Sequence, residues 1–226
     1  MEPREDARAA QAADGLTCHV LDPDSGLEPR SALVDEAYCR WRAVWQPTFF
    51  ELTGQVTLHS DEFCRQHELV TLFQAERCVG LTGFRYIDLG SDVTRHDSYF
   101  ASWPDEAYAA ARSWGREACI IGNFMVTPEH RGRRGGFSLS EIVTVLSLHR
   151  LATSRANVAL VTTRNDRRVN QLMYRYGAHR LFENATLHGV SVDLVAFPRE
   201  EVKAMLRAPS LQSMIRKLAA TDRSRP

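Results

Sequence analysis

The second half of this 226-residue chain contains a strand pattern, a helix pattern and a second strand pattern in succession. The apolar run from Ala118 to Val126 (ACIIGNFMV) is long enough for a strand, is too short for a free helix, and is closed by Pro128. From Phe137 to Arg155 apolar residues recur at helical spacing, and Asn157 to Thr163 (NVALVTT) is again almost continuously apolar. Strand, helix and strand in this order predict a right-handed parallel crossover, and therefore an α/β fold with a parallel pair of strands.

The first half of the chain predicts strands and one long helix. Thr17 to Leu21 is a short strand, and a helix begins at Ser31 and is expected to end at Pro47. Two segments rich in β-branched and aromatic residues predict an antiparallel hairpin, and the stretch between them and the apolar run predicts a long loop with a short helix. These segments are Glu68–Gln74, Cys78–Leu89 and Gly90–Arg116.

Further helices and a hairpin are expected toward the C-terminus. A helix is capped by Asn165 or Asp166 and ends at Gly177, where a left-handed C-cap costs least. A hairpin turns at His188-Gly189, and Leu211, Met214, Ile215 and Leu218 lie on one face of a terminal helix. We expect one domain over residues 16–198, C-terminal helices over 199–220 that pack on it, and disordered tails at 1–15 and 221–226.

Composition excludes several classes of protein. With 28 basic and 28 acidic residues the formal net charge is zero, so nothing in the overall charge favours nucleic acid or an anionic membrane. The five cysteines are scattered without a C-x-x-C pair, and the histidines form no H-x-x-x-H pair, so neither a disulfide framework nor a metal site is expected. We expect a cytoplasmic protein, because the first fifteen residues lack the apolar core of a secretion signal and no apolar run is long enough for a membrane span.

The turn between the apolar strand and the long helix is unusually basic and rich in glycine. It reads His-Arg-Gly-Arg-Arg-Gly-Gly from His130 to Gly136. The first N–H groups of a helix lack partners and attract anions, glycine lets a phosphate approach closely, and guanidinium groups match phosphate oxygens. The turn therefore indicates a pyrophosphate site, although neither G-x-G-x-x-G nor the P-loop motif is present.

Two motifs resemble the GNAT superfamily of acyl-CoA-dependent N-acyltransferases. In that superfamily the turn reads V-x-P-x-x-R-G-x-G-x-G, which Val126, Pro128, Arg131, Gly132 and Gly136 match, and a later helix ends in an L-Y-x-x-x-G-F-like motif, which Met173-Tyr174 and Gly177 match in part. The resemblance covers about Cys78 to Phe197. It implies a mixed, mostly antiparallel sheet with a parallel pair at the cofactor site, flanked by helices.

The resemblance also implies where the acyl donor binds. The strand from Asn123 to Thr127 is expected to splay from its neighbour and bind the pantetheine arm, while the turn binds the pyrophosphate. Arg134 replaces the first glycine of the G-x-G pair and must adopt a conformation that glycine adopts more readily, which leaves open whether the acyl carrier is coenzyme A or acyl carrier protein. The implied donor-binding residues are Met125, Val126, Thr127, Arg131, Gly132, Arg133, Arg134, Gly135, Gly136 and Asn165.

The mechanism implied by the resemblance is direct attack of an amine on the thioester. Tyr174 lies off the inner face of its helix and is the candidate acid that protonates the leaving thiolate. Asn123 interrupts an apolar strand, so its amide is expected to bond a substrate or a neighbouring backbone group. Glu117 is a candidate general base, and the alternatives Glu76, His96 and Asp97 stay open.

The resulting hypothesis is an N-acyltransferase that moves an acyl group, acetyl in the first instance, from acyl-CoA to a primary amine of a small molecule. A second possibility is a long-chain N-acyltransferase, similar to N-acyl amino acid synthases and acyl-homoserine lactone synthases, that takes acyl-CoA or acyl carrier protein and an amino acid. A third, from another class, is a non-catalytic module that binds acyl-CoA or nucleic acid. The acceptor and the oligomeric state are left open.

Overall fold

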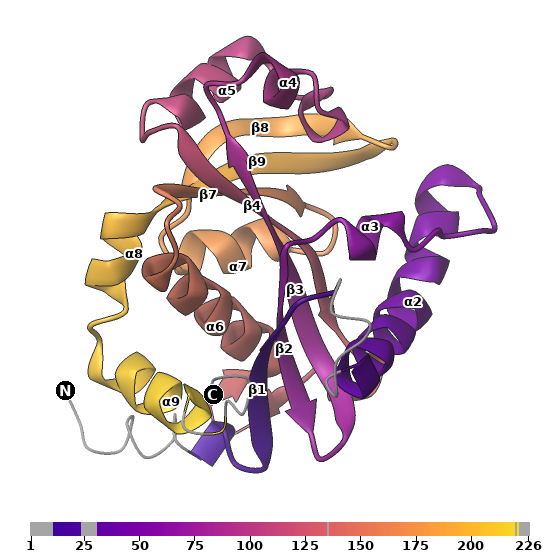
Figure 1. The fold of residues 1–226 in the computed structure, drawn as a ribbon, viewed down its shortest axis with the longest axis vertical. Coiled ribbons are helices and arrows are strands. Elements are labelled where there is room, and N and C mark those ends of the chain that lie inside the picture. The colour runs from indigo at the N-terminus through magenta and orange to yellow at the C-terminus, as the bar shows by residue number, and fades with distance from the viewer. Residues whose placement is uncertain (1–10, 24–30, 135, 220, 222–226) are drawn as a thin grey trace. The chain divides into compact units, whose positions relative to one another are not determined.

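The computed structural model describes residues 11–23, 31–134, 136–219 and 221, with only the backbone of Ser31, Arg133 and Arg134 (Figure 1). Seven strands form one sheet in the order β1-β2-β3-β4-β7-β9-β8. Strands β4 and β7 are parallel, whereas β1–β2, β2–β3, β7–β9 and β8–β9 are antiparallel. This mixed sheet with one parallel pair confirms the predicted fold class. The strands are β1 Leu16–Leu21, β2 Glu68–Gln74, β3 Arg77–Asp88, β4 Glu117–Val126, β7 Val158–Arg164, β8 His179–Leu187 and β9 Val190–Pro198.

The chain divides into two compact units, through which β3, β4 and helix α6 (Leu139–Thr153) continue. The first unit comprises Met1–Phe84, Asn123–Arg150 and Leu206–Pro226, and the second comprises Arg85–Gly122 and Leu151–Met205. Each unit contains its own cluster of buried apolar side chains. The boundaries of the expected domain and its tails, at 15/16, 198/199 and 220/221, stay predictions.

Helices cover both faces of the strands in the first unit (Figure 1). Helix α2 (Ser31–Thr53) buries Trp41 in the same apolar cluster as Phe73 and Leu81 of the β2–β3 hairpin. On the other face, Thr82 Oγ1 and Ser147 Oγ of α6 lie 2.6 Å apart in a hydrogen bond. Helix α2 therefore packs on one face through apolar side chains, and α6 on the other face makes an additional polar contact.

Helix α2 continues past the proline that was expected to end it. Pro47 lies inside the helix, which runs to Thr53, so the predicted end was wrong. Proline removes one backbone donor and usually breaks a helix. Here Thr48 and Thr53 donate their hydroxyls to the carbonyls of Val44 and Phe49, and Phe49 packs against the apolar cluster. Tertiary packing of the last turns outweighs the local cost of the proline.

The N- and C-terminal parts of the first unit meet at β1. The backbone N–H of Cys18 donates to Thr221 Oγ1, and Ala12 and Ala13 are buried. Helix α9 (Pro209–Ala219) buries the four apolar residues that the sequence placed on one face: Leu211, Met214, Ile215 and Leu218. The expected terminal helix is thus confirmed.

The second unit packs helices against β7, β9 and β8. The stretch after β3 holds α4 (Asp92–Arg95), a 3-10 turn η1 (Ser98–Phe100) and α5 (Asp105–Arg112), where one short helix was expected. Phe100 and Trp103 are buried with Leu160 and Leu194 of the sheet. Helix α8 (Arg199–Met205) follows β9 directly.

Helix α7 (Val169–Arg175) begins differently from the expectation. Its N-cap is Arg168, in the left-handed region at φ 56°, and the side chain makes no capping hydrogen bond. Neither Asn165 nor Asp166 is the cap, so this prediction was wrong. Asp166 pairs with Arg164, and Asn165 is turned toward Asp193, to which its Nδ2 donates.

The five cysteines are free thiols, of which Cys18, Cys78 and Cys119 are buried. Burial raises the pKa of the Cys78 thiol to about 12, so this sulfur stays protonated and behaves as a core side chain. Among the residues the structure describes, no helix is long and apolar enough to cross a membrane, and no cluster of three metal-ligating side chains occurs.

Candidate functional site

The end of β4 is bent at Asn123, in the first unit. Asn123 has φ 55°, a left-handed conformation that asparagine tolerates better than most residues. Its Nδ2 donates to the backbone carbonyl of Glu62 at 2.8 Å. Of the two expected partners, a substrate or a neighbouring backbone group, the structure shows the second. Asn123 therefore fixes the shape of the strand just before Met125, Val126 and Thr127.

The first half of the basic turn is held by side chains. Thr127 is buried, its N–H donates to Val79 O, and its hydroxyl bonds His130 Nδ1 at 2.8 Å. The other ring nitrogen of His130 lies 3.0 Å from Gln74 Oε1, and Arg131 Nε donates to Val126 O. These bonds fix the direction in which the chain leaves β4.

The second half of the turn is a small hairpin. Strands β5 (Arg133–Arg134) and β6 (Phe137–Ser138) pair antiparallel, and Gly136 has φ 107°, which favours glycine. Backbone pairing uses amide groups that were expected to face a pyrophosphate. The expected Gly135 lies outside the described residues. Glycine is thus required here by the hairpin, whether or not an anion binds.

Helix α6 begins with a capping box. The N–H and hydroxyl of Ser138 both donate to Glu141 Oε2, at 2.7 and 2.9 Å, and the N–H of Glu141 donates back to Ser138 Oγ at 3.2 Å. Glu141 is 7% exposed. Two N–H groups at this terminus, those of Ser138 and Glu141, therefore have partners within the chain, and the Glu141 carboxylate lies beside the first turn of α6. Arg131 and Gly132 of the preceding turn are exposed.

The parallel pairing of β4 with β7 is short. Within the second unit it joins Ala118–Cys119–Ile120 to Val158–Ala159–Leu160, and it ends there although both strands continue. Gly122 lies two residues beyond Ile120, the last paired residue of β4, and a Cβ built on it would meet no atom within 4 Å. Backbone groups and open space therefore coincide just beyond the paired segment.

The hydroxyl of Tyr174, in the second unit, makes two hydrogen bonds. It donates to Asp193 Oδ2 at 2.6 Å and accepts a bond from Arg180 Nε at 3.1 Å. The Arg180 guanidinium also lies 4.9 Å from the centre of the Tyr174 ring. Burial, together with the Asp193 carboxylate, raises the pKa of Tyr174 to about 12.

Asp193 is a buried charge surrounded by donors. It is 4% exposed, and its carboxylate accepts bonds from three side chains and one backbone N–H. Burial alone would raise the pKa of Asp193, but these bonds outweigh it and lower the pKa to about 2. We call Asn165, Asn170, Tyr174, Arg180, Asn184 and Asp193 the Asp193 cluster.

Asn165 belongs to this cluster through its amide. Its Nδ2 donates to Asp193 Oδ1 at 2.9 Å and to Ser191 Oγ at 3.0 Å, while Asn165 Oδ1 is buried without a partner among the described residues. The expected donor-binding role of Asn165 thus stays a prediction, and its observed role is to bind the carboxylate.

The candidate bases are dispersed over different elements. Glu117 is exposed at the start of β4, and Glu76 is exposed in the hairpin turn. Asp97 is paired with Arg85 at 2.7 Å and caps η1, and His96 Nδ1 bonds the carbonyl of Asp92. The structure brings Tyr174 and Asn165 together at Asp193, but no hydrogen bond between the described residues joins either of them to Glu117.

Sequence reasoning missed Asp193, Arg180, Glu141 and His130. Two of these carried a readable signal. Asp193 is the one charged residue in the strand VSVDLVAF, and Ser138-Leu-Ser-Glu141 is a capping-box pattern before an apolar helix. Arg180 and His130 gain their partners only through folding.

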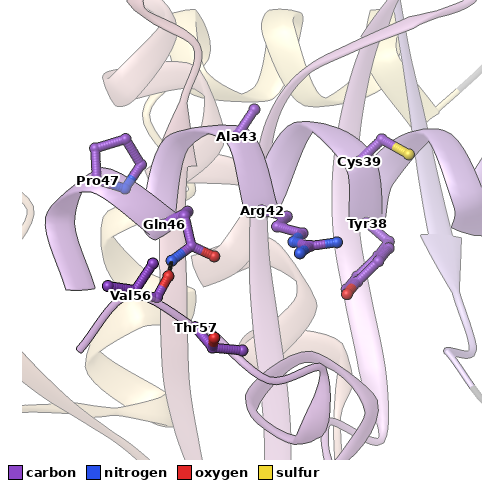
Figure 2. A pocket seen from close by; sticks show the side chains of 8 residues that line it. All are labelled: Tyr38, Cys39, Arg42, Ala43, Gln46, Pro47, Val56 and Thr57. Atoms are coloured by element: carbon purple, nitrogen blue, oxygen red, sulfur yellow. Dashed lines mark hydrogen bonds between the residues drawn. The ribbon is translucent and has the colours of Figure 1, made fainter. Parts of the chain in front are cut away.

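A groove of about 640 Å³ lies on the solvent side of α2 (Figure 2). Gln46 closes one end, where its amide bonds the carbonyl of Val56 and the N–H of Leu58, and Arg42 extends toward the Tyr38 ring. No residue predicted to be functional lines this groove. Its lining consists of Tyr38, Cys39, Arg42, Ala43, Gln46, Pro47, Val56 and Thr57.

The sheet order, the parallel pair and the turn before α6 define a GNAT-like fold, and solved structures share it. The N-acyl amino acid synthase FeeM from uncultured soil microbes aligns over 84% of this chain and 95% of its own, at 11% identity and a TM-score of 0.57. BjaI, a coenzyme A-dependent acyl-homoserine lactone synthase solved with SAM and isopentyl-CoA, aligns over 92% of this chain and 99% of its own, at 12% identity and 0.56.

A third solved structure, the coenzyme A-dependent acyl-homoserine lactone synthase MesI, covers 89% of this chain and 95% of its own, at 10% identity and a TM-score of 0.53. No protein-family model and no curated protein matches the sequence. At these identities the likeness establishes the fold, and it confirms the fold expected from the two motifs.

Proposed function

We propose that the protein is an N-acyltransferase that transfers an acyl group from a coenzyme A thioester to the primary amine of a small molecule. The observation that carries the proposal is the early end of the β4–β7 pairing at Ile120 and Leu160. Strand edges that lose their partner can pair with an extended ligand that carries amides of its own. The pantetheine arm is such a ligand, and the structural neighbours are named for acyl transfer.

The donor's arm would enter beside Gly122. The open space over this glycine leaves room for an extended chain, which any larger side chain would reduce. A backbone N–H of the opened strand would then donate to the thioester carbonyl and stabilise the negative charge that develops on its oxygen.

The donor's phosphates are assigned to the exposed side of the turn. Arg131 keeps its guanidinium at the surface while Nε is anchored on Val126 O, and a guanidinium offers further N–H groups to phosphate oxygens. Gly132 has open space over its Cα. Since the Glu141 carboxylate lies at the α6 terminus and would repel a phosphate there, we assign phosphate recognition to guanidinium groups more than to helix amides.

The reaction is a direct displacement. The amine nitrogen attacks the thioester carbonyl carbon and forms the C–N bond of the amide. The C–S bond then breaks, and the amine proton is transferred to a base or to water. A free thiol ionises at a pKa of about 8.5, so coenzyme A can depart as a thiolate at neutral pH without an obligatory acid. Glu117 is the candidate base, because it is the exposed carboxylate on β4 itself.

The length of the acyl group divides the proposal into two candidates. The sequence favoured acetyl. FeeM is named for N-acyl amino acids and BjaI was solved with isopentyl-CoA, which supports a longer acyl group and an amino-acid-like acceptor as the second candidate. Acyl carrier protein is the alternative donor in that case.

Thermal stabilisation by a series of donors tests this function. A ligand that binds only the native state raises stability by RT ln(1 + [L]/Kd), so coenzyme A, acetyl-CoA, isopentyl-CoA and palmitoyl-CoA at equal concentration rank their affinities. The proposal predicts a shift with at least one of them, followed by thiol release when amines are added. A shift without thiol release from any amine would indicate a binding module, and no shift with any donor would remove the coenzyme A site.

A further inference from the structure

The Asp193 cluster ties together four segments of the second unit. Asp193 lies on β9, Asn165 in the β7–α7 connection, Asn170 and Tyr174 on α7, and Asn184 on β8. Their bonds to the carboxylate span 2.6 to 3.0 Å. A buried carboxylate with every oxygen engaged is an acceptor at fixed positions, so it determines the orientation of each group that donates to it.

The direction of the Tyr174 proton follows from this geometry. An ionised carboxylate only accepts hydrogen bonds, so the single hydroxyl proton lies on the line from Tyr174 Oη to Asp193 Oδ2. Arg180 Nε donates into a lone pair of the same oxygen, and its Nη1 is paired with Glu183. The charged groups bonded to Tyr174 are therefore Asp193 on β9 and Arg180 on β8, and Glu183 on β8 pairs with Arg180.

We infer, on the basis of the proposed acyl transfer, that Asp193 is a positioning residue that holds Tyr174 as a fixed, protonated hydroxyl, so that Tyr174 does not serve as the acid for the leaving thiolate. Losing the proton would place a tyrosinate 2.6 Å from a carboxylate, with one guanidinium to compensate two negative charges.

The magnitudes agree with this assignment. The pKa of Tyr174 is raised to about 12. Against a thiol with a pKa of about 8.5, transfer of that proton to a thiolate is unfavourable by more than three orders of magnitude. The same bonds keep Asp193 ionised, so it does not supply a proton either. Asp193 instead fixes α7 and the β7–α7 connection. These lie next to β7, whose pairing with β4 ends at Leu160.

A spectroscopic titration tests the Asp193–Tyr174 relationship without any substrate. Tyrosinate absorbance is followed with pH in the wild type and in Tyr174→Phe, and the difference isolates Tyr174 from the deeply buried Tyr99. We expect Tyr174 to ionise above pH 11 and, in Asp193→Asn, at least one pH unit lower. An ordinary value near 10 in the wild type, or no change in Asp193→Asn, would overturn the inference.

Kinetics test the role in the reaction. We expect Tyr174→Phe to lower kcat less than tenfold and to keep the alkaline limb of the pH–rate profile in place, whereas loss of a general acid lowers the rate by 10² or more. A loss of that size at unchanged KM, with the alkaline limb abolished, would make Tyr174 the acid. Should Asp193→Asn fail to fold, Asn170→Ala replaces it, because it removes one donor to Asp193 Oδ2 and leaves the Tyr174 side chain unchanged. The carboxylate then stays charged with one donor fewer, so we expect the Tyr174 pKa to stay at or above its wild-type value, and a fall toward 10 would contradict the inference.

The two measurements separate the inference from the proposed function. If no donor and amine yield product, the proposed function fails, while the titration still decides whether Asp193 fixes the proton of Tyr174. If product forms and the titration gives an ordinary tyrosine, the function stands and the inference fails.

Discussion

Ser138 and Glu141 satisfy each other across the first turn of α6: the serine N–H and hydroxyl donate to the glutamate carboxylate, and the glutamate N–H donates to the serine oxygen. This exchange fixes the end of the helix that a superfamily resemblance would assign to a phosphate. The first turn of α6 is therefore held by side chains of the chain itself.

Removal of either member of this pair should destabilise the first unit. We expect Ser138→Ala to lower the free energy of unfolding by about 1 kcal/mol, as loss of an N-cap does. Urea unfolding of Ser138→Ala, Glu141→Ala and the double variant should give a coupling of at least about 0.5 kcal/mol. The matched control is Ser140→Ala, two residues into the same segment, which should change stability little. Additive effects of the two substitutions would contradict the reciprocal capping.

Asp193 should make the free energy of unfolding depend on pH in the acid range. Its folded pKa is depressed to about 2 from 3.8, so its contribution is present above the unfolded pKa and is lost as the pH falls through the folded one. The shift corresponds to about 2 kcal/mol. The gap in unfolding free energy between wild type and Asp193→Asn should therefore narrow by about that amount from pH 5 to pH 2.

The exposed Asp88, paired with Arg116 at 2.6 Å, supplies the control for this titration. Arg116 lowers the pKa of Asp88 as well, but solvent screens this surface pair, so the gap for Asp88→Asn should be small and should narrow less than the gap for Asp193→Asn. A gap for Asp193→Asn that stays constant from pH 5 to pH 2 would mean that the carboxylate is not stabilised in its ionised form.

Local signals in the sequence were sufficient for much of the fold. The apolar runs of β4 and β7 and the periodic helix between them predicted the parallel pair, and the left-handed C-cap at Gly177 is observed at φ 84°. Pro47 was misjudged because the contacts that keep α2 helical beyond it come from residues distant in sequence. Propensity describes the cost of a proline but not the packing that outweighs it.

The candidate site could be predicted only in part, for a similar reason. Tyr174 was identified by its place on a helix, yet its hydrogen bonds and its pKa are set by Asp193 on β9 and Arg180 on β8. Asn165 was assigned to the donor, yet its amide binds the same carboxylate. Residue type and spacing give the groups that can react, whereas hydrogen-bond partners across the sheet decide which of them are available.

The end of α7 offers a prediction on backbone strain. Gly177 N–H donates to Tyr174 O and Ala178 N–H to Met173 O, which is the Schellman arrangement around a left-handed residue. Gly177→Ala should cost about 1 kcal/mol in unfolding free energy. Gly132→Ala, where φ is not positive and a Cβ meets no atom within 4 Å, is the control and should be close to neutral in stability. Equal effects at both positions would remove the conformational explanation.

Helix α2 should gain stability when its internal proline is replaced. Pro47 is exposed and leaves the carbonyl of Ala43 without its usual helical donor. We expect Pro47→Ala to raise the free energy of unfolding by about 1 kcal/mol or more, after the greater freedom of the unfolded chain is allowed for. Arg42→Ala, on the same helix and also exposed, should change it by less than about 0.5 kcal/mol. A lower melting temperature for Pro47→Ala would mean that the proline itself contributes to the packing of α2.

Gly122 gives the sharpest test of where the donor lies. A side chain there meets open space in the free protein, so Gly122→Val should fold with nearly unchanged stability, since valine also favours a strand. If the pantetheine arm runs along β4 at this point, the added methyl groups occupy its path, and the affinity for the best acyl-CoA should fall at least tenfold. Thr186→Val, on the exposed face of β8, is a matched control that should bind the donor like the wild type. Calorimetric titration of all three proteins measures the difference, and Gly122→Ala gives an intermediate step if valine disturbs the strand. Undiminished affinity in Gly122→Val would place the donor elsewhere, and the early end of the β4–β7 pairing would then no longer support the proposed function.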